Sequence, residues 1–420
     1  MRFLQALLMS MLLIGPTAVF AFEENPTPHF LPLDLTTEEY HQLWQHHLAS
    51  LGTKALDDLE PATREGINGG EKLSLWLKKI NQTRSPERQI RLTSPGTRSG
   101  IPIDSPSIYG PKQISESLAK MKSTLPAELT QVVYGTTDIT ATFPGTEEEF
   151  IKHARQVDRL YQTATRWATS IKPWLSWYRS AQARDVRGYY YLNKIADVDS
   201  KLQNFAQLPL EEQNALKRNL VGICRNARHT QSECEQSFVG SRSNNQVLGF
   251  KNRYWANAIN AWNTFFKISN PRQDVDWTAV NAQRLSIEFR DPSNNRIRDF
   301  LKDNIEDEFK FGDWRLEMSF TNGGSGTAYL EFQPNVTPHV TGGNVIVMDA
   351  NAPIEEYEVA WTIRHEYGHI LRLPDCYVEF YDDTIESVVN YQLDTTDLMC
   401  SRAGNMNERI YLELKHAYFR

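Results

Sequence analysis

The sequence predicts an α+β protein in which a mainly helical N-terminal region precedes a C-terminal domain built on a twisted mixed sheet. Two patterns lead to this prediction. Apolar residues recur at helical spacing through much of residues 113–271, whereas alternating stretches typical of strands appear only after residue 272. The chain has 420 residues, 40% of them hydrophobic and 23% charged, which is an ordinary globular composition and enough for two or three domains.

The charge balance argues against nucleic acid as a partner. Lys and Arg total 45 against 52 Asp and Glu, which gives a formal net charge of −7. A nucleic-acid-binding domain usually carries a strongly basic face, and nothing of that kind is indicated here. We therefore expect no nucleic-acid partner, and the oligomeric state stays open.

Residues 1–21 have the features of a secretory signal peptide. Arg2 is followed by an apolar stretch from Leu4 to Ile14 and then by small residues that end at Ala21. This stretch is shorter than the roughly 20 residues that a membrane-spanning helix needs, and no later stretch is long and apolar enough. We expect cleavage near Ala21, no membrane span, and a secreted or periplasmic protein.

The four cysteines fit an oxidising compartment because an even number in an exported chain favours disulfides. Four cysteines allow three pairings, and proximity in the chain favours Cys224–Cys234 and Cys376–Cys400. A four-cysteine zinc site would need C-x-x-C spacing, which is absent.

The region before the C-terminal domain divides into two parts. Residues 22–112 are expected to form an N-terminal segment with short helices, one of them near Lys72–Ile80, and a linker rich in Pro, Ser and Gly. Residues 113–271 are expected to be mainly helical. The predicted helices there cover Glu147–Ala196, Leu210–Cys224 and Val247–Ile268.

Residues 272–420 change pattern to strands and helices in alternation. Leu285, Ile287 and Phe289 alternate with polar neighbours as a strand would, and a helical pattern follows at Ile297–Phe309. This strand and helix open a mixed sheet. Further strands are predicted at Trp314–Phe320, Tyr329–Gln333 and Asn344–Met348.

His365, Glu366 and His369 form an HExxH pattern on a predicted helix that has Pro353 near its first turn. The two histidines lie one turn apart and can hold one Zn²⁺ from a single rigid element, while Glu366 lies beside the water that the metal activates. With this composition a random His-acid-x-x-His is expected about 0.03 times per chain. The sequence therefore predicts one Zn²⁺ per chain, with Glu366 as the general base.

The run from His365 to Asp375 resembles the metzincin zinc-peptidase signature HExxHxxGxxH, in the variant whose third ligand is aspartate, as in snapalysin-like enzymes. The resemblance implies that Asp375 is the third zinc ligand. Thr396–Cys400 looks like the methionine turn of this family, with Met399 in the role of the methionine. The resemblance covers residues 272–420 and implies a metzincin-like catalytic domain.

Two positions depart from the family pattern. Arg372 stands where the family usually has glycine, which lets the chain leave the helix with a positive φ and return to the metal. Ser401 stands where some metzincins place a tyrosine that supports the oxyanion. For the nearby Tyr377 a packing role is expected.

Acidic residues downstream offer alternatives. Glu379 or Glu386 would be the third ligand in a thermolysin-like arrangement, which leaves Met399 unexplained. A calcium site is a second alternative, but no loop of spaced ligands is present, so a solvated surface is expected. The acids concerned are Asp375, Glu379, Asp382, Asp383 and Glu386.

We therefore expect an exported zinc-dependent endopeptidase that binds a protein or peptide substrate in extended form at an open sheet edge. The resemblance places that edge near Ala328–Gln333. Two other functions stay open, a zinc amidase acting on cell-wall peptides and a catalytically decayed zinc-binding or scaffold protein. Whether residues 22–271 are a removable pro-segment also stays open.

Overall fold

The structure is a computed structural model that describes residues 58–419, except for 86–87, 91, 93–99, 279–282, 325, 334–335, 337 and 350–356. The expected signal peptide at 1–21 lies outside the described residues, and so does Pro353. Among the described residues, no helix has the length and apolar character that crossing a membrane requires.

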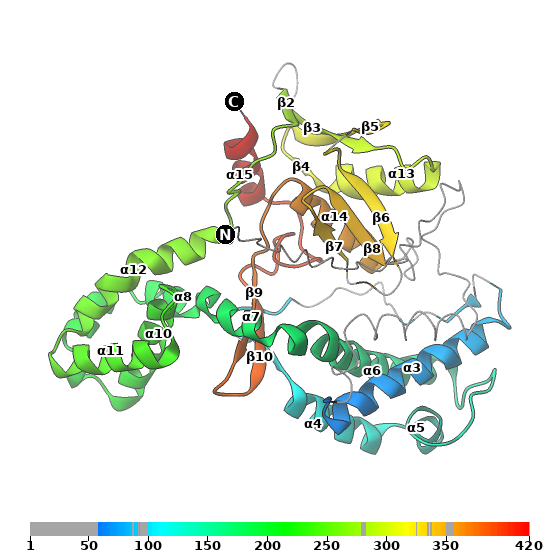
Figure 1. Ribbon diagram of the computed structural model, residues 1–420, viewed down its shortest axis with the longest axis horizontal. Helices are drawn as coiled ribbons and strands as arrows, with labels where there is room; N and C mark the ends of the chain where they lie inside the picture. The colour runs from blue at the N-terminus through cyan, green and yellow to red at the C-terminus, as the bar shows by residue number, and fades with distance from the viewer. Residues whose placement is uncertain are drawn as a thin grey trace, which may run out of the picture.

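The fold is mixed α+β, as predicted. Figure 1 shows strands packed around helix α14 in an upper body, a layer of helices α3–α6 below it, and a helical lobe of α8–α12 at one side. Strands β9 and β10 form a hairpin that runs from the upper body down to the helical layer.

The helical layer is built on the pair α3 and α6, which pack against each other. Helix α6 begins at a capping box in which Thr146 and Glu149 satisfy each other's backbone N–H groups. Trp76 and Phe150 meet edge to face in the core between the helices, with 5.2 Å between ring centroids. The helices of this layer are α3 (Pro61–Asn81), α4 (Pro111–Thr124), α5 (Ala127–Val133) and α6 (Glu147–Arg166).

Helix α3 begins earlier than the predicted Lys72–Ile80, since it continues through glycines that usually weaken a helix. These glycines are needed for packing against neighbouring rings. A Cβ at Gly69 would collide with the ring of Tyr134, and a Cβ at Gly70 would collide with Tyr161. The close approach of these rings compensates for the low helix propensity of glycine.

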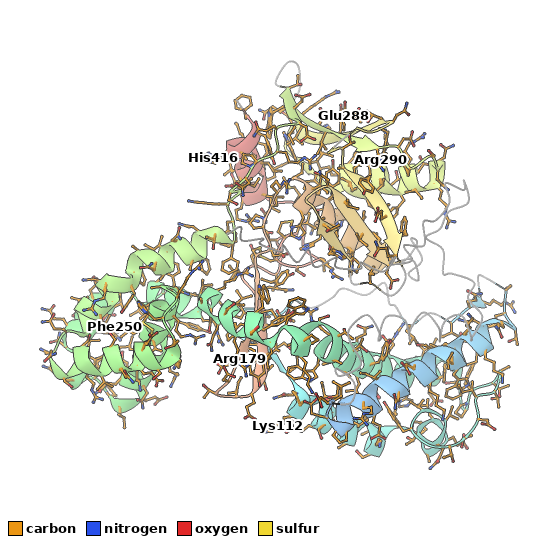
Figure 2. The ribbon with its side chains drawn as sticks, viewed as in Figure 1. Lys112, Arg179, Phe250, Glu288, Arg290 and His416 are labelled. Atoms are coloured by element: carbon orange, nitrogen blue, oxygen red, sulfur yellow. A yellow bond between two sulfur atoms is a disulfide. The ribbon has the colours of Figure 1, made fainter. Side chains whose placement is uncertain are left out.

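The lobe has a hydrophobic core of its own around Phe250, which Figure 2 shows inside it. The Cys224–Cys234 disulfide joins α10 to α11, which confirms the predicted pairing. Short helical turns and α7 connect α6 to the lobe: η2 (Trp167–Ile171), η3 (Lys172–Trp174), α7 (Leu175–Ser180) and η4 (Ala181–Arg184). The lobe contains α8 (Arg187–Asn193), α9 (Val198–Gln203), η5 (Phe205–Gln207), α10 (Leu210–Arg225), α11 (Gln231–Ser243) and α12 (Val247–Thr264).

The upper body contains a strand or helix at each position predicted after residue 272. The strands before α14 (Tyr357–Ile370) are β2 (Val275–Thr278), β3 (Gln283–Arg290), β4 (Lys310–Phe311), β5 (Trp314–Thr321), β6 (Tyr329–Gln333), β7 (His339–Thr341) and β8 (Val345–Asp349). Helix α13 (Asn295–Leu301) and η6 (Lys302–Glu306) connect β3 to β5. After α14 come β9 (Tyr377–Asp382), β10 (Ser387–Gln392) and α15 (Glu408–Tyr418).

Strands β2 to β8 form two sheets that meet at one point, and β9 and β10 form a third sheet with β1 (Ser107–Tyr109). One has the order β2-β3-β5-β4 and the other β6-β8-β7, with β3 parallel to β5 and β6 parallel to β8. Ala328 bridges Phe289, and the N–H of Arg290 donates to the Ala328 carbonyl at 2.7 Å, which joins β6 to β3.

The segment Ala328–Gln333, expected as an open sheet edge, forms β6 at one end of the sheet β6-β8-β7. It bonds to β8 along its length and to β3 only at Ala328. The antiparallel strand β7, His339–Thr341, is at the other end of this sheet and contacts α14. The sheet therefore has two edge strands, which pairing between distant segments determines.

The hydrophobic cores cross the expected boundary at residue 271. Tyr381 and Val388 of the β9–β10 hairpin belong to the core of the helical layer, and β1 (Ser107–Tyr109) pairs antiparallel with β10. In the other direction, Val186 and Phe265 belong to the core of the upper body.

Candidate metal centre

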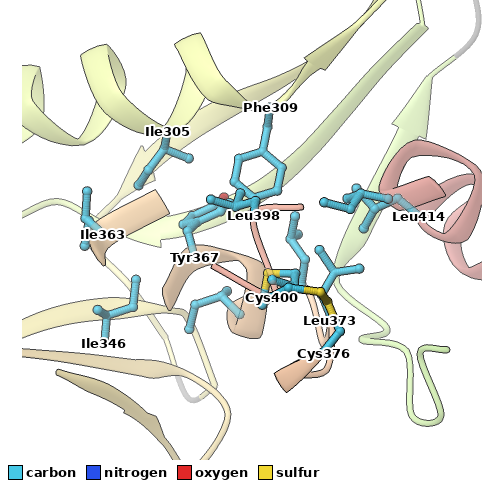
Figure 3. Close-up of a cluster of buried hydrophobic side chains, with 14 of the residues drawn as sticks. Ile305, Phe309, Ile346, Ile363, Tyr367, Leu373, Cys376, Leu398, Cys400 and Leu414 are labelled. Atoms are coloured by element: carbon cyan, nitrogen blue, oxygen red, sulfur yellow. A yellow bond between two sulfur atoms is a disulfide. The ribbon is translucent and has the colours of Figure 1, made fainter. Parts of the chain in front are cut away.

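The face of α14 that enters the core determines where its histidines point. Ile363, Tyr367 and Ile370 are completely buried, and the ring of Tyr367 lies 5.8 Å from the ring of Phe309 between centroids. Figure 3 shows Ile363 and Tyr367 in this cluster. His365 lies two residues from Tyr367, about 200° round the helix, so it points away from this cluster.

The residues predicted as metal ligands come together in the structure. His365 Nε2 lies 3.1 Å from Asp375 Oδ1, and His369 Nε2 lies 3.2 Å from the same oxygen. These side chains offer three ligand atoms that all lie within 4.8 Å of one another. Helix α14 supplies the two histidines, and the loop between α14 and β9 supplies the aspartate.

Backbone carbonyls fix the tautomers of both histidines. His365 Nδ1 lies 2.9 Å from the carbonyl oxygen of Leu398, and His369 Nδ1 lies 2.9 Å from that of Leu373. A carbonyl only accepts hydrogen bonds, so each Nδ1 carries a proton, and Nε2 is the nitrogen of each ring that faces Asp375. Asp375 Oδ1 is itself buried without a hydrogen-bond donor directed at it.

Three electron-pair donors facing one point repel each other unless a cation lies between them. Burial lowers the pKa of His369, but the adjacent Asp375 outweighs burial and raises the pKa to about 9. Burial likewise raises the pKa of Asp375, but the two histidines hold it far below its usual range. Two imidazoles and one carboxylate are also the donor set of a catalytic zinc site, which keeps a fourth position for water.

The chain leaves α14 through the residue that departs from the family glycine. Arg372 has a φ of 65°, in the left-handed region that glycine favours. The N–H of Leu373 donates to the Gly368 carbonyl at 3.0 Å and the N–H of Arg372 to the His369 carbonyl at 2.9 Å, which together form a Schellman motif. Arg372 therefore makes the same turn as a glycine and lets the chain return to Asp375.

Met399 lies in the loop after β10 and packs against α14 at Gly368. Its side chain is completely buried, and a Cβ at Gly368 would collide with its Sδ atom. The glycine of the HExxH segment therefore lets the thioether pack directly against α14. The carbonyl of Met399 also accepts a hydrogen bond of 3.1 Å from the N–H of Cys376.

The predicted Cys376–Cys400 disulfide is present and connects the ligand loop to this turn. Figure 3 shows the two sulfur atoms bonded beside Leu373. Cys376 follows Asp375 directly, and Cys400 follows Met399 directly. The loop that carries Asp375, the third candidate ligand, is thus covalently attached to the turn that contains Met399.

Glu366 is almost completely buried, with 3% of its surface exposed, and its charge contributes to the raised pKa of His369. It follows His365 directly on α14, so it belongs to the same helix as both candidate histidine ligands. Tyr377 opens β9, and burial raises the pKa of its hydroxyl, so this group carries its proton at neutral pH.

The rival acidic residues do not join the histidines. Glu379 on β9 accepts hydrogen bonds from Tyr109 and Arg166, the latter at 2.6 Å. Glu386 is exposed in the hairpin turn. Within the described residues, the acids considered for calcium form no cluster of metal-binding size.

Asp397 is a residue of the site that the sequence analysis missed. It is completely buried in the Met399 turn, where its Oδ1 accepts a hydrogen bond of 2.8 Å from the N–H of Met399. Its Oδ2 accepts from Asn407 and Arg409. Cys376 and Cys400 lie near this carboxylate, but their sulfurs are joined in a disulfide and offer no thiolate to a metal. An aspartate two residues before a turn N–H is a known local pattern, which could have identified this role.

Comparison of the chain with protein-family models, curated proteins and solved structures finds no match. The site geometry and the sequence patterns are therefore the basis on which a function can be proposed.

Proposed function

We propose that this chain is a zinc-dependent endopeptidase with a metzincin-like catalytic domain. The observation that carries the proposal is the convergence of His365 Nε2, His369 Nε2 and Asp375 Oδ1 on one point. Glu366 follows His365 directly on the same helix. Three protein ligands and a neighbouring carboxylate are the parts that metal-assisted hydrolysis of a peptide bond needs.

The order of elements supports the metzincin resemblance. A strand and a helix are followed by several strands and then by α14, and Met399 packs against this helix at Gly368. The parallel strands β3, β5, β6 and β8 and the antiparallel β7 lie on the N-terminal side of α14 in the chain. Metzincins likewise run from a strand and a helix through several strands to the active-site helix.

Each residue of the site has a distinct task in the proposed reaction. A zinc ion, when bound, supplies Lewis acidity that activates water and polarises the scissile carbonyl. His365 and His369 would hold this ion through Nε2, and Asp375 would hold it through Oδ1. The Glu366 carboxylate takes the proton of the attacking water and then donates it to the leaving amine.

The edge strand β7 offers a place for the substrate backbone. It pairs on one side with β8 and contacts α14, so an extended peptide added to its other side would run past the histidines. Main-chain hydrogen bonds then supply affinity with little sequence preference. The two disulfides fit an oxidising compartment, and we propose a secreted or periplasmic location.

Arg372, which replaces the family glycine, is the one hint of a decayed site, but its positive φ supports an intact loop to Asp375. The amidase alternative uses the same metal chemistry on a different amide. The test therefore includes cell-wall peptide fragments beside casein as substrates.

The experiment measures zinc content and hydrolysis for the protein from residue 22 to 420 and for three variants. We expect one zinc per chain, loss of activity but not of zinc in Glu366→Ala, and weakened zinc binding in Asp375→Ala. Glu386→Ala is the matched control, since this exposed carboxylate lies in the hairpin turn and should change neither property. A wild-type protein that binds no zinc, or a Glu366→Ala variant with full activity, would overturn the proposal.

A further inference from the structure

Asp397 and Arg409 form a buried ion pair just below the candidate metal centre. Asp397 is completely buried, whereas 28% of the Arg409 side chain is exposed. Arg409 donates from Nε at 2.9 Å and from a terminal nitrogen to the same oxygen, Asp397 Oδ2. Asn407 donates to this oxygen as well, at 2.7 Å.

The remaining acceptor atoms of Asp397, its Oδ1 and its backbone carbonyl, stabilise the turn that contains Met399. Its Oδ1 accepts from the N–H of Met399, and its backbone carbonyl accepts from the N–H groups of Cys400 and Ser401 at 3.1 and 2.9 Å. Leu398 lies between Asp397 and Met399 in the chain. The N–H of Leu398 donates to the Asn405 carbonyl at 3.1 Å, so the peptide units on both sides of Leu398 are held.

The carbonyl of Leu398 is the group that accepts the proton of His365 Nδ1 at 2.9 Å. Its direction determines which nitrogen of His365 is protonated and how the ring is turned. A chain of contacts therefore runs from Arg409 through Asp397 and the Leu398 carbonyl to His365, the more buried of the two histidines.

A second ion pair holds the same loop from the helix. Arg364, next to His365 on α14, pairs with Glu308 and donates to the Arg402 carbonyl at 3.2 Å. Glu308 in turn accepts from the N–H of Met406. The loop after Met399 is thus fixed to α14, which leaves Asp397 to set the position of Leu398 within it.

Stability alone is a weak reason for burying a carboxylate, because the desolvation of two charges offsets much of their attraction. Orientation of a ligand is a better-supported role for a polar group that lies one step behind it. We propose that Asp397, held by Arg409, is a positioning residue of the metal centre that orients the Leu398 carbonyl and through it His365. This inference rests on the metal centre of the proposed function.

The test compares zinc affinity by chelator competition and the visible spectrum of the Co²⁺-loaded protein in three variants. Asp397→Asn removes the charge at constant shape, and Arg409→Lys keeps the charge but removes the planar fork. Asp185→Asn is the matched control. Asp185 is another buried carboxylate, and it accepts hydrogen bonds from Arg187 and from the Tyr391 hydroxyl.

We expect Asp397→Asn to weaken zinc binding about tenfold to a hundredfold and Arg409→Lys to weaken it less. Both should shift the Co²⁺ spectrum, which reports ligand geometry and would not respond to a loss of stability alone. Asp185→Asn should lower stability and leave both readouts unchanged. If Asp397→Asn does not fold, Arg409→Lys decides by the same two readouts.

Wild-type affinity and an unchanged Co²⁺ spectrum in the folded Asp397 and Arg409 variants would overturn the inference while the metal centre stands. Equal loss of affinity in Asp185→Asn would also overturn it, because the effect would then be general. A wild-type protein without zinc affinity would overturn the metal centre itself, and this inference with it.

Discussion

Arg372 has the backbone conformation of a glycine and a side chain that contacts a second turn. Its φ of 65° closes α14, and its guanidinium lies against Gly343 in the turn between β7 and β8, where a Cβ on residue 343 would collide with it. An L-residue in the left-handed region carries a steric cost that glycine avoids. The side chain therefore joins the end of α14 to the β7–β8 turn at the expense of local strain.

Position 372 allows a prediction in which a glycine variant is more stable than an alanine variant, the reverse of the usual order inside a helix. Alanine exceeds glycine in helix propensity, but at position 372 Arg372→Gly should be more stable than Arg372→Ala by about 1 kcal/mol, since only glycine avoids the cost of positive φ. Urea denaturation of both variants measures the difference. An alanine variant as stable as the glycine variant would show that α14 ends in another conformation.

For single residues, the sequence predicts a role when the groups involved are close together in the chain. His365 and His369 share one helix, so their spacing alone predicts that they face the same way, and the resemblance adds Asp375 six residues later. The roles of Leu398 and Asp397 depend on where a backbone carbonyl points and on Arg409 in a later helix. A local pattern indicates that Asp397 caps its own turn, but no periodic pattern encodes where the Leu398 carbonyl points, so the sequence does not predict the link from Asp397 to His365.

Helix α3 carries a partly buried carboxylate whose ionisation opposes folding. Burial alone raises the pKa of Glu71 from 4.5 to about 7. The folded state therefore holds a proton that the unfolded state has released between these two pH values. Stability is fully present below pH 4.5 and falls as the pH rises to about 7.

We expect Glu71→Gln to match the wild type near pH 4 and to exceed it at pH 8 by on the order of 2 kcal/mol, after allowance for partial exposure to solvent. The measurement is the free energy of unfolding in urea at several pH values. Glu116→Gln on the exposed side of α4 is the control and should leave the pH profile unchanged. A Glu71 variant with the wild-type profile would contradict the burial of this carboxylate.

The two disulfides allow a second prediction at the scale of elements. Each closes a loop, with sequence separations of 24 for Cys376–Cys400 and 10 for Cys224–Cys234, so replacing either pair by alanine should cost about 2–4 kcal/mol of stability. Only the Cys376–Cys400 replacement should weaken zinc binding, because this bond attaches the Asp375 loop to the Met399 turn. Chelator competition on both variants checks this. Unchanged zinc affinity without Cys376–Cys400 would assign this bond to stability alone.

Among the elements, patterns within one segment predicted more than pairings between segments. The alternation around Leu285 and Trp314 predicted β3 and β5 because each pattern lies within a few residues. The pairing of β1 with β10 joins segments far apart in the chain, and β1 lies in a stretch expected to be a linker. The glycines of α3 weaken the helical pattern in the sequence. They are needed because Tyr134 and Tyr161 approach the helix closely, which is a contact between distant segments.

Over the whole molecule, the β9–β10 hairpin connects the candidate site to the helical layer. It begins two residues after Asp375, and its far end buries Tyr381 and Val388 in the core of α3–α6. Figure 2 shows Arg179 beside the hairpin, where it pairs with Asp383 at 2.8 Å. Removal of the helical layer as a pro-segment would expose both buried residues and take away the β1 partner of β10.

The hairpin should therefore unfold together with the helical layer rather than with the lobe. Val157→Ala on α6, where the side chain is completely buried, should cost about 2 kcal/mol. Amide hydrogen exchange in α6 and in β9–β10 should then accelerate by the same factor, roughly 30-fold, since each 1.4 kcal/mol is tenfold. Amides of α10 and α12 should keep their rates, because the lobe has a separate core around Phe250. Hairpin amides that keep wild-type rates while those of α6 accelerate would show that the helical layer opens alone, and would restore the possibility that it is removed without disturbing the loop of Asp375.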